Sequence, residues 1–133
     1  MICRLKKKEI EEIKPTNILP QTPFWGRLKN KQGFEPKGFE LTVSKDLLHY
    51  SSRDNHKIQD DILILIKFLD ASHCFAYVPY GPKLEPDMEN QGVFLEQLSE
   101  TIRPYLPRTC IFIRYDLIWK NQWAIDDDYF DLS

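Results

Sequence analysis

Cysteine and glycine are scarce in this sequence. Its 133 residues contain three cysteines and five glycines. Cys3, Cys74 and Cys110 lie far apart, form no CxxC pair and match no histidine spacing, which argues against a disulfide framework and against a zinc site. We therefore expect three reduced thiols, two of them buried, and no metal centre.

Long apolar runs and targeting signals are also missing. The longest apolar stretch spans residues 62–69 and is interrupted by Lys67, so it is far shorter than the ~20 residues that cross a bilayer. The basic residues near the N-terminus are not followed by the apolar segment of a secretory signal. These absences predict a cytoplasmic protein without a transmembrane segment.

The usual local signatures of catalysis do not occur. The sequence holds no P-loop, no GxSxG motif, no HExxH motif and no glycine-rich phosphate loop. Its formal net charge of −2 gives no overall attraction to nucleic acid, so a polyanion would have to meet a local patch. Residues 4–8 and 27–37 are basic and residues 126–131 are acidic, and we interpret the two terminal segments as solvated.

The residues that are present suit one folded domain. A chain of this length can bury a single core but is marginal for two. We place that domain over residues 1–119. Residues 120–133 are predicted to be an acidic, loose C-terminal tail with Trp119 and Trp123 as its anchors.

A short helix with clear boundaries is predicted after residue 21. Thr22 is a suitable N-cap, Pro23 fits the first helical position, and Gly33 can close the last turn in a left-handed conformation. The start and the stop signal together define one short helix.

This helix carries aromatic residues and cations. At helical spacing, Trp25 and Lys29 share one stripe, whereas Arg27 lies elsewhere on the helix. One interpretation is a core helix with a solvated basic face. The other is an anion site in which the aromatics anchor the helix and Arg27 or Lys29 reaches into a cleft.

Apolar patterning predicts several strands. Residues 2–13 begin as a strand and continue in a helical turn or two, and residues 39–44 alternate as a half-buried strand. Residues 62–69 are apolar on both faces and predict a central strand, which forms an antiparallel hairpin with residues 74–78. We interpret the polar residues 45–61 as a mobile connection.

Two histidines fall in that connection. We expect His49 and His56 to face solvent rather than to bind a ligand.

A second amphipathic helix follows, capped by Asp87 or Asn90 and ended by the prolines at 104 and 107. Its apolar positions recur at spacings of three and four: Phe94, Leu95, Leu98, Ile102 and Tyr105. A strand over residues 110–119 comes next and pairs parallel with residues 74–78 through a right-handed crossover. The predicted fold class is α/β of the α+β kind, with a mixed, largely antiparallel sheet and flanking helices.

Two strand ends are candidate binding sites. The segment Pro79-Tyr80-Gly81-Pro82 ends a central strand in a sharp bend, because proline cannot donate to a ladder and Gly81 permits the turn. Arg114 and Asp116 lie near the end of the last strand. There they could bind substrate or pair with each other.

Three segments in this order resemble a known family. Gln21-Thr-Pro-Phe-Trp-Gly-Arg-Leu-Lys29, Phe75-Ala-Tyr-Val-Pro-Tyr-Gly-Pro82 and Ile113-Arg-Tyr-Asp116 are similar to the amino-terminal part of the FemABX peptidoglycan-bridge aminoacyltransferases. The resemblance covers residues 18–119. It implies a fold similar to GCN5-related N-acetyltransferases, of which family members carry two copies.

The resemblance also implies an activity. The family transfers an amino acid from aminoacyl-tRNA, the co-substrate, to an amine on the stem peptide of a peptidoglycan precursor, either lipid II or the UDP-linked muramyl pentapeptide. No metal or organic cofactor is implied. Because the transferred ester is already activated on tRNA, the chemistry needs positioning and oxyanion stabilisation rather than a protein nucleophile.

The resemblance assigns substrate-binding residues but no catalytic residue. A cation on the helix after Trp25 matches the one that the family uses on the precursor's diphosphate, and here it is Arg27 or, by preference, Lys29. The precursor-facing bend matches Tyr80, Gly81 and Pro82. Trp25, Arg114 and Asp116 complete the candidate set of substrate-binding residues.

Departures from the family pattern define the alternatives. Family members are longer, and their second acetyltransferase-like domain has no counterpart in this chain. Tyr80 stands where the family often has a basic residue. We therefore expect a partial domain, incomplete as an enzyme alone, with a homodimer as one way to replace the missing half.

Two other functions compete with this one. A non-catalytic interaction module derived from the same fold is the first. A small acyl-CoA N-acetyltransferase is the second, and it is disfavoured because the chain has no glycine-rich pyrophosphate loop between strand and helix.

Overall fold

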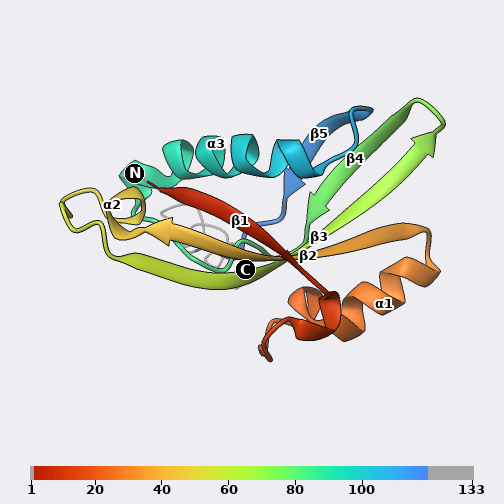
Figure 1. Ribbon diagram of the computed structural model, residues 1–133, viewed down its shortest axis with the longest axis horizontal. Coiled ribbons are helices and arrows are strands. Elements are labelled where there is room, and N and C mark those ends of the chain that lie inside the picture. Colours follow the sequence, from red (N-terminus) through yellow and green to blue (C-terminus); the bar gives the residue numbers. More distant parts are fainter. Residues whose placement is uncertain (1, 120–133) are drawn as a thin grey trace, which may run out of the picture.

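The computed structural model of the protein describes residues 2–119 and is built on one five-stranded sheet (Figure 1). The strands follow one another across the sheet in chain order: β1 (Cys3–Lys8), β2 (Phe34–Ser44), β3 (Lys57–Asp70), β4 (His73–Val78) and β5 (Cys110–Tyr115). Neighbouring strands pair antiparallel except β4 and β5, which are parallel. The predicted α+β class is confirmed, and the arrangement is consistent with a partial acetyltransferase-like fold.

Helices cover both faces of this sheet. The α-helices are α1 (Pro23–Lys31), α2 (Lys45–Leu48) and α3 (Gln91–Ile102), and 3-10 helices occupy Ile10–Glu12, Leu19–Gln21, Met88–Asn90 and Arg103–Tyr105. α1 and α3 lie on opposite faces (Figure 1). The main core lies between the sheet and α3, and a smaller core lies under α1. Within residues 2–119, no helix is both long and apolar enough to span a membrane.

The boundaries of α1 arise from its capping residues, as predicted. The Thr22 hydroxyl accepts a hydrogen bond from the Trp25 backbone N–H at 3.2 Å, and Pro23 occupies the first turn. Gly33 follows the helix with φ +93°, a conformation that favours glycine.

The central strand is apolar on both faces because both faces are covered. Ile62 and Ile64 belong to the main core, whereas Leu63 and Leu65 belong to the smaller core under α1. The predicted central strand, its antiparallel hairpin with β4 and the parallel pairing of β4 with β5 are all confirmed. Strand-plus-turn structure at the N-terminus is confirmed as well, by β1 and the 3-10 helix after it.

The prediction of a mobile connection over residues 45–61 is wrong at both ends of the segment, and only residues 49–56 form a connection without helix or strand. Residues 45–48 form α2 and bury Leu47 and Leu48, and β3 begins at Lys57. Residues 57–61, which are polar except for Ile58, continue the β2–β3 ladder, whose register runs to the pair Ser44 and Lys57. Strand pairing thus overrides the weak apolar signal of this segment. For the same reason β2 begins at residue 34 rather than 39.

The two histidines of that segment differ. His56 is exposed, as predicted. The His49 side chain is only 42% exposed, and its Nδ1 lies 3.3 Å from Asp87 Oδ1. The Asp87 carboxylate therefore contacts His49 and accepts from the Tyr50 N–H, just after α2, and does not cap α3.

The other proposed cap, Asn90, is buried and donates to the Leu47 carbonyl at 2.8 Å. Neither proposed cap bonds α3 through its side chain. Both side chains instead join α2 to the start of α3.

The last predicted strand is shorter than expected. β5 ends at Tyr115, and Trp119 is buried beyond it, where its ring stacks on Phe94 with centroids 5.9 Å apart. Trp119 is thus an anchor, as predicted. Trp123 and the predicted tail over residues 120–133 lie outside the described residues.

The cysteines are all free, and one of them is buried. Cys74 lies on β4, an inner strand of the sheet, whereas Cys3 and Cys110 lie on the edge strands β1 and β5 and are partly exposed. The prediction of two buried cysteines is wrong because edge strands are covered less than central ones.

Candidate functional site

The bend after β4 has an unusual backbone. Tyr80 has φ +49°, in the left-handed region that non-glycine residues rarely adopt, and its side chain is 47% exposed. Gly81 and Pro82 are joined by a cis peptide bond and are buried. The bend therefore presents one aromatic side chain on a backbone that the surrounding residues hold.

Gln21 holds the bend from one side. Its side chain is 1% exposed, and its amide nitrogen donates to the Pro79 carbonyl at 2.6 Å and to the Leu63 carbonyl at 3.3 Å. Its amide oxygen accepts from the Leu63 N–H at 2.8 Å. In the β3–β4 register, Pro79 would pair next with Leu63, but Pro79 has no N–H. The Gln21 amide therefore replaces the missing strand partner.

Gly81 is required beside this amide. A Cβ at Gly81 would lie 2.9 Å from the Gln21 Nε2 atom, which is too close for an ordinary contact. Trp119 holds the other side of the bend, because its indole N–H donates to the Pro82 carbonyl at 2.7 Å. The segment that begins with Gln21 is thus in direct contact with the segment that ends with Pro82.

A second group of polar side chains lies at the ends of the parallel strands β4 and β5. The Tyr77 hydroxyl donates to the Asp116 carboxylate, and the Arg114 guanidinium lies 5.6 Å from the Tyr77 ring centroid. Arg114 also lies 3.6 Å from Asp116, so these two residues pair with each other. Because ligands often bind at the carboxyl ends of parallel strands, this position suits a binding site.

The surroundings of Tyr77 change its pKa. Burial raises the pKa of Tyr77 to about 12, and the hydrogen bond and negative charge of Asp116 add to the rise. Tyr77 therefore remains a neutral phenol that donates to a carboxylate near neutral pH. The Arg114 side chain is 65% exposed, so its pairing with Asp116 is weak and leaves the guanidinium accessible.

The structure separates the two cations proposed on α1. The Lys29 ammonium lies 5.0 Å from the Trp25 ring centroid and 5.7 Å from that of Phe34, on the helix side that faces the sheet. Arg27 instead lies 3.5 Å from Glu11 and borders a hollow of about 410 Å³ between α1 and the 3-10 helix at residues 10–12. Lys29 therefore shares a face with Tyr77, which packs in the same small core as Trp25.

Trp25 anchors α1, and its indole has an unpaired donor. The ring packs against Leu63 and Leu65 of the small core. Its Nε1 atom is buried and has no hydrogen-bond acceptor in the part of the chain that the structure describes. Leaving such a donor unpaired costs roughly 1–3 kcal/mol.

Gln21 and Tyr77 are site residues that sequence reasoning did not single out. Both stand inside the motifs that carry the family resemblance, but their partners lie far away in the sequence, 42 and 58 residues from Gln21 and 39 from Tyr77. The available signal was weak. A glutamine beside a helix cap is usually exposed, and nothing local predicted that it would be buried.

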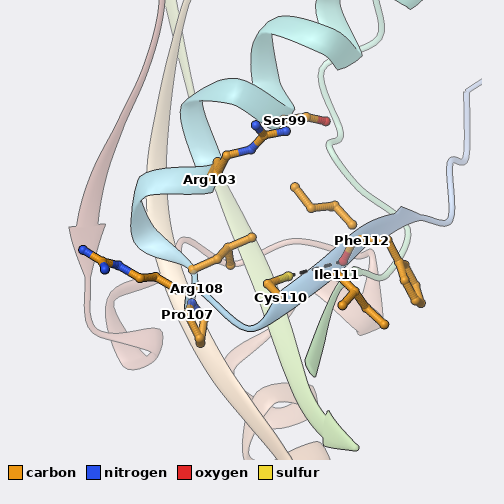
Figure 2. A pocket seen from close by; sticks show the side chains of 9 residues that line it. Ser99, Arg103, Pro107, Arg108, Cys110, Ile111 and Phe112 are labelled. Carbon is orange, nitrogen blue, oxygen red and sulfur yellow. Dashed lines mark hydrogen bonds between the residues drawn. The ribbon is translucent and has the colours of Figure 1, made fainter. Parts of the chain in front are cut away.

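The cavity in Figure 2 lies away from all these residues. It measures about 460 Å³ and opens between the end of α3 and β5. Its lining includes Arg103, Arg108 and Cys110 but no carboxylate and no histidine, and it contains none of the predicted site residues (Figure 2). We therefore place the candidate site at the bend and on the α1 face.

Over residues 2–119, no three histidine, cysteine, aspartate or glutamate side chains are grouped so that they could hold a metal ion. Comparison with known proteins gives no further guide, because no family model, no curated protein and no solved structure matches the chain.

Proposed function

We propose that this chain is the precursor-binding part of a FemABX-type aminoacyltransferase that acts in the cytoplasm. Such an enzyme moves an amino acid from aminoacyl-tRNA to an amine on the stem peptide of a peptidoglycan precursor. One observation carries the proposal: Gln21, which opens the first resembling motif, bonds directly to the bend that ends the second. The Tyr77–Asp116 hydrogen bond joins the second motif to the third, so three motifs that are distant in the sequence support one surface.

The polar groups on this surface suit the proposed reaction. The amine nitrogen attacks the ester carbonyl carbon, the ester C–O bond breaks, and the ribose hydroxyl of the tRNA leaves while the amine loses a proton. This reaction needs residues that position the two substrates and stabilise the developing oxyanion. Arg114 and the Tyr80 bend supply exposed groups at one end, and Lys29 supplies a cation for the precursor's diphosphate at the other.

Binding of the precursor is the direct test. We expect the UDP-linked muramyl pentapeptide to bind the chain measurably in calorimetry, and Lys29→Ala to weaken binding about tenfold, the loss of one charge-assisted contact. Arg27→Ala is the matched control, because Arg27 faces Glu11 on another side of the same helix. Absence of binding by the folded protein at millimolar ligand would contradict the proposal.

Turnover is expected to be absent. On the proposed function aminoacyl-tRNA binds a second domain, so these 133 residues alone should transfer no amino acid from charged tRNA to the precursor. Robust transfer would show that one domain suffices.

One observation favours a second candidate, a non-catalytic interaction module. β5 is an edge strand on which Ile111 and Phe112 are exposed at 55% and 49%. An apolar edge strand is a surface for pairing with another chain, including a second copy in a homodimer. Self-association through β5 is the measurable consequence.

A further inference from the structure

Lys67 and Lys29 contact the same two residues, Gln32 and Phe34, although they are far apart in the sequence. Lys67 is on β3 and pairs across the sheet with Phe34, the first residue of β2. The Lys67 ammonium is 5.2 Å from the Phe34 ring centroid, and the Lys29 ammonium is 5.7 Å from the same centroid. Two cations therefore lie within 6 Å of one aromatic ring on the α1 face of the sheet.

Both ammonium groups bond to one neutral residue. Lys29 Nζ donates to the Gln32 side-chain oxygen at 3.1 Å, and Lys67 Nζ lies 3.5 Å from the Gln32 carbonyl oxygen. No carboxylate pairs with either lysine among residues 2–119. The ion pairs of other lysines show the difference, since Lys8 pairs with Asp61 and Lys83 with Asp60.

Gly33 makes room for the second cation. A Cβ at Gly33 would lie 2.8 Å from Lys67 Nζ, so any other residue would displace the ammonium group. The left-handed φ of +93° favours glycine at this position for a second, independent reason.

Two unneutralised cations at one place match a doubly charged anion. An ammonium group is a common point-charge ligand of phosphate, and each of these two keeps N–H donors beyond the one that it gives to Gln32. The carbonyl end of α1 offsets part of their charge through its dipole, but that partial charge is smaller than either cation. We propose that Lys67 acts with Lys29 to bind a phosphate or diphosphate group, which on the proposed function belongs to the peptidoglycan precursor.

The position along the sheet agrees with this assignment. Lys67 pairs with Phe75 of β4, and Tyr77 is the next residue of β4 on the same face. Two residues along a strand span about 7 Å. A diphosphate between the two lysines would therefore leave the attached sugar and peptide free to extend past Tyr77 toward the Tyr80 bend.

Calorimetry with the full chain tests the site, using inorganic pyrophosphate and the UDP-linked muramyl pentapeptide as separate ligands. We expect Lys67→Gln and Lys29→Gln each to lower the binding affinity for both ligands about tenfold or more, as loss of a charge-assisted contact predicts. Lys31→Gln on the same helix is the control and should leave both affinities within about twofold. A soluble lipid-linked diphosphate analogue compared with the UDP-linked ligand shows which source of diphosphate the site prefers.

The outcomes separate this inference from the proposed function. If the two lysines only stabilise the C-terminal end of α1, Lys67→Gln will have a lower melting temperature than the wild type and unchanged affinity for both ligands. That result overturns the two-cation site. Precursor binding that does not depend on Lys67 also overturns it while the proposed function stands. Pyrophosphate binding that depends on Lys67, with the muramyl pentapeptide bound no more tightly than pyrophosphate, supports the site and removes the proposed function. Failure of the wild-type chain to bind either ligand overturns both.

Discussion

The two edge strands of the sheet have opposite chemistry. β1 reads Cys-Arg-Leu-Lys-Lys-Lys and is charged along its exposed side, whereas β5 reads Cys-Ile-Phe-Ile-Arg-Tyr and exposes apolar side chains on both faces. Cations on an edge strand discourage pairing with another chain, and exposed apolar residues favour it. The chemistry of β1 therefore disfavours pairing with a further strand, whereas that of β5 favours it.

The ion pairs near the two edges differ as well. At the β1 side, Lys8 pairs at 2.9 Å with Asp61, which is buried and also accepts from the Lys14 backbone N–H at 2.7 Å. At the β5 side, the Arg114–Asp116 pair is largely exposed. A buried pair is costly to break on one side only, whereas an exposed pair contributes little.

The largest expected effect is on the β1 side. Asp61→Ala leaves Lys8 without its carboxylate and Lys14 without an acceptor, so we expect the free energy of unfolding to fall by about 3 kcal/mol or more. Arg114→Ala is the matched variant on the β5 side and should cost less than about 1 kcal/mol. Urea unfolding of both variants measures the difference. Equal losses would show that the two edges are held equally firmly.

An intermediate effect is expected on self-association. Ile111→Lys gives β5 the chemistry of β1, and we expect it to weaken self-association about tenfold, while Lys6→Ile on β1 strengthens it. Analytical ultracentrifugation of the two variants beside the wild type measures both changes. If Ile111→Lys associates as the wild type does, β5 is not the associating edge.

The smallest effect concerns the pH dependence of stability on the β5 side. The pKa of Tyr77 is about 12 in the folded chain, above the ordinary value of about 10 expected after unfolding. Because the folded state holds the proton more tightly, the stabilisation is complete below about pH 10 and is lost as the pH rises through about 12. Burial also raises the pKa of Tyr115 to about 12, so Tyr77→Phe should reduce this loss without abolishing it.

Urea unfolding at several pH values between 9 and 12 checks this prediction. A Tyr77→Phe variant that loses stability as steeply as the wild type would contradict it.

Elements with local signals were predicted well from the sequence. The Thr22 cap and the proline after it define α1, and the apolar residues 62–66 predict a strand covered on both faces. The segment over residues 45–61 failed because its strand residues are polar and are held by pairing with β2. Local patterns do not report such long-range pairing.

The candidate site was predicted only in part for the same reason. Lys29 and Arg27 are equivalent as cations in the sequence, and only the packing of Trp25 and Phe34 places them on different sides of α1. The position of Lys67 beside Phe34 depends on the register of β2 against β3. The resembling motifs include Gln21, but nothing in the sequence indicated that its side chain is buried and bonds to the Pro79 carbonyl.

The Gln21 amide gives the site a built-in reporter. The Leu63 backbone N–H lies in the central strand, yet its acceptor is the Gln21 side chain rather than another strand. Hydrogen exchange at this amide therefore follows the docking of the segment before α1, whereas exchange at the neighbouring β3 amides follows opening of the sheet. A ligand that tightens the bend would slow exchange at Leu63 first, so one amide resonance can report occupancy of the site without any added probe.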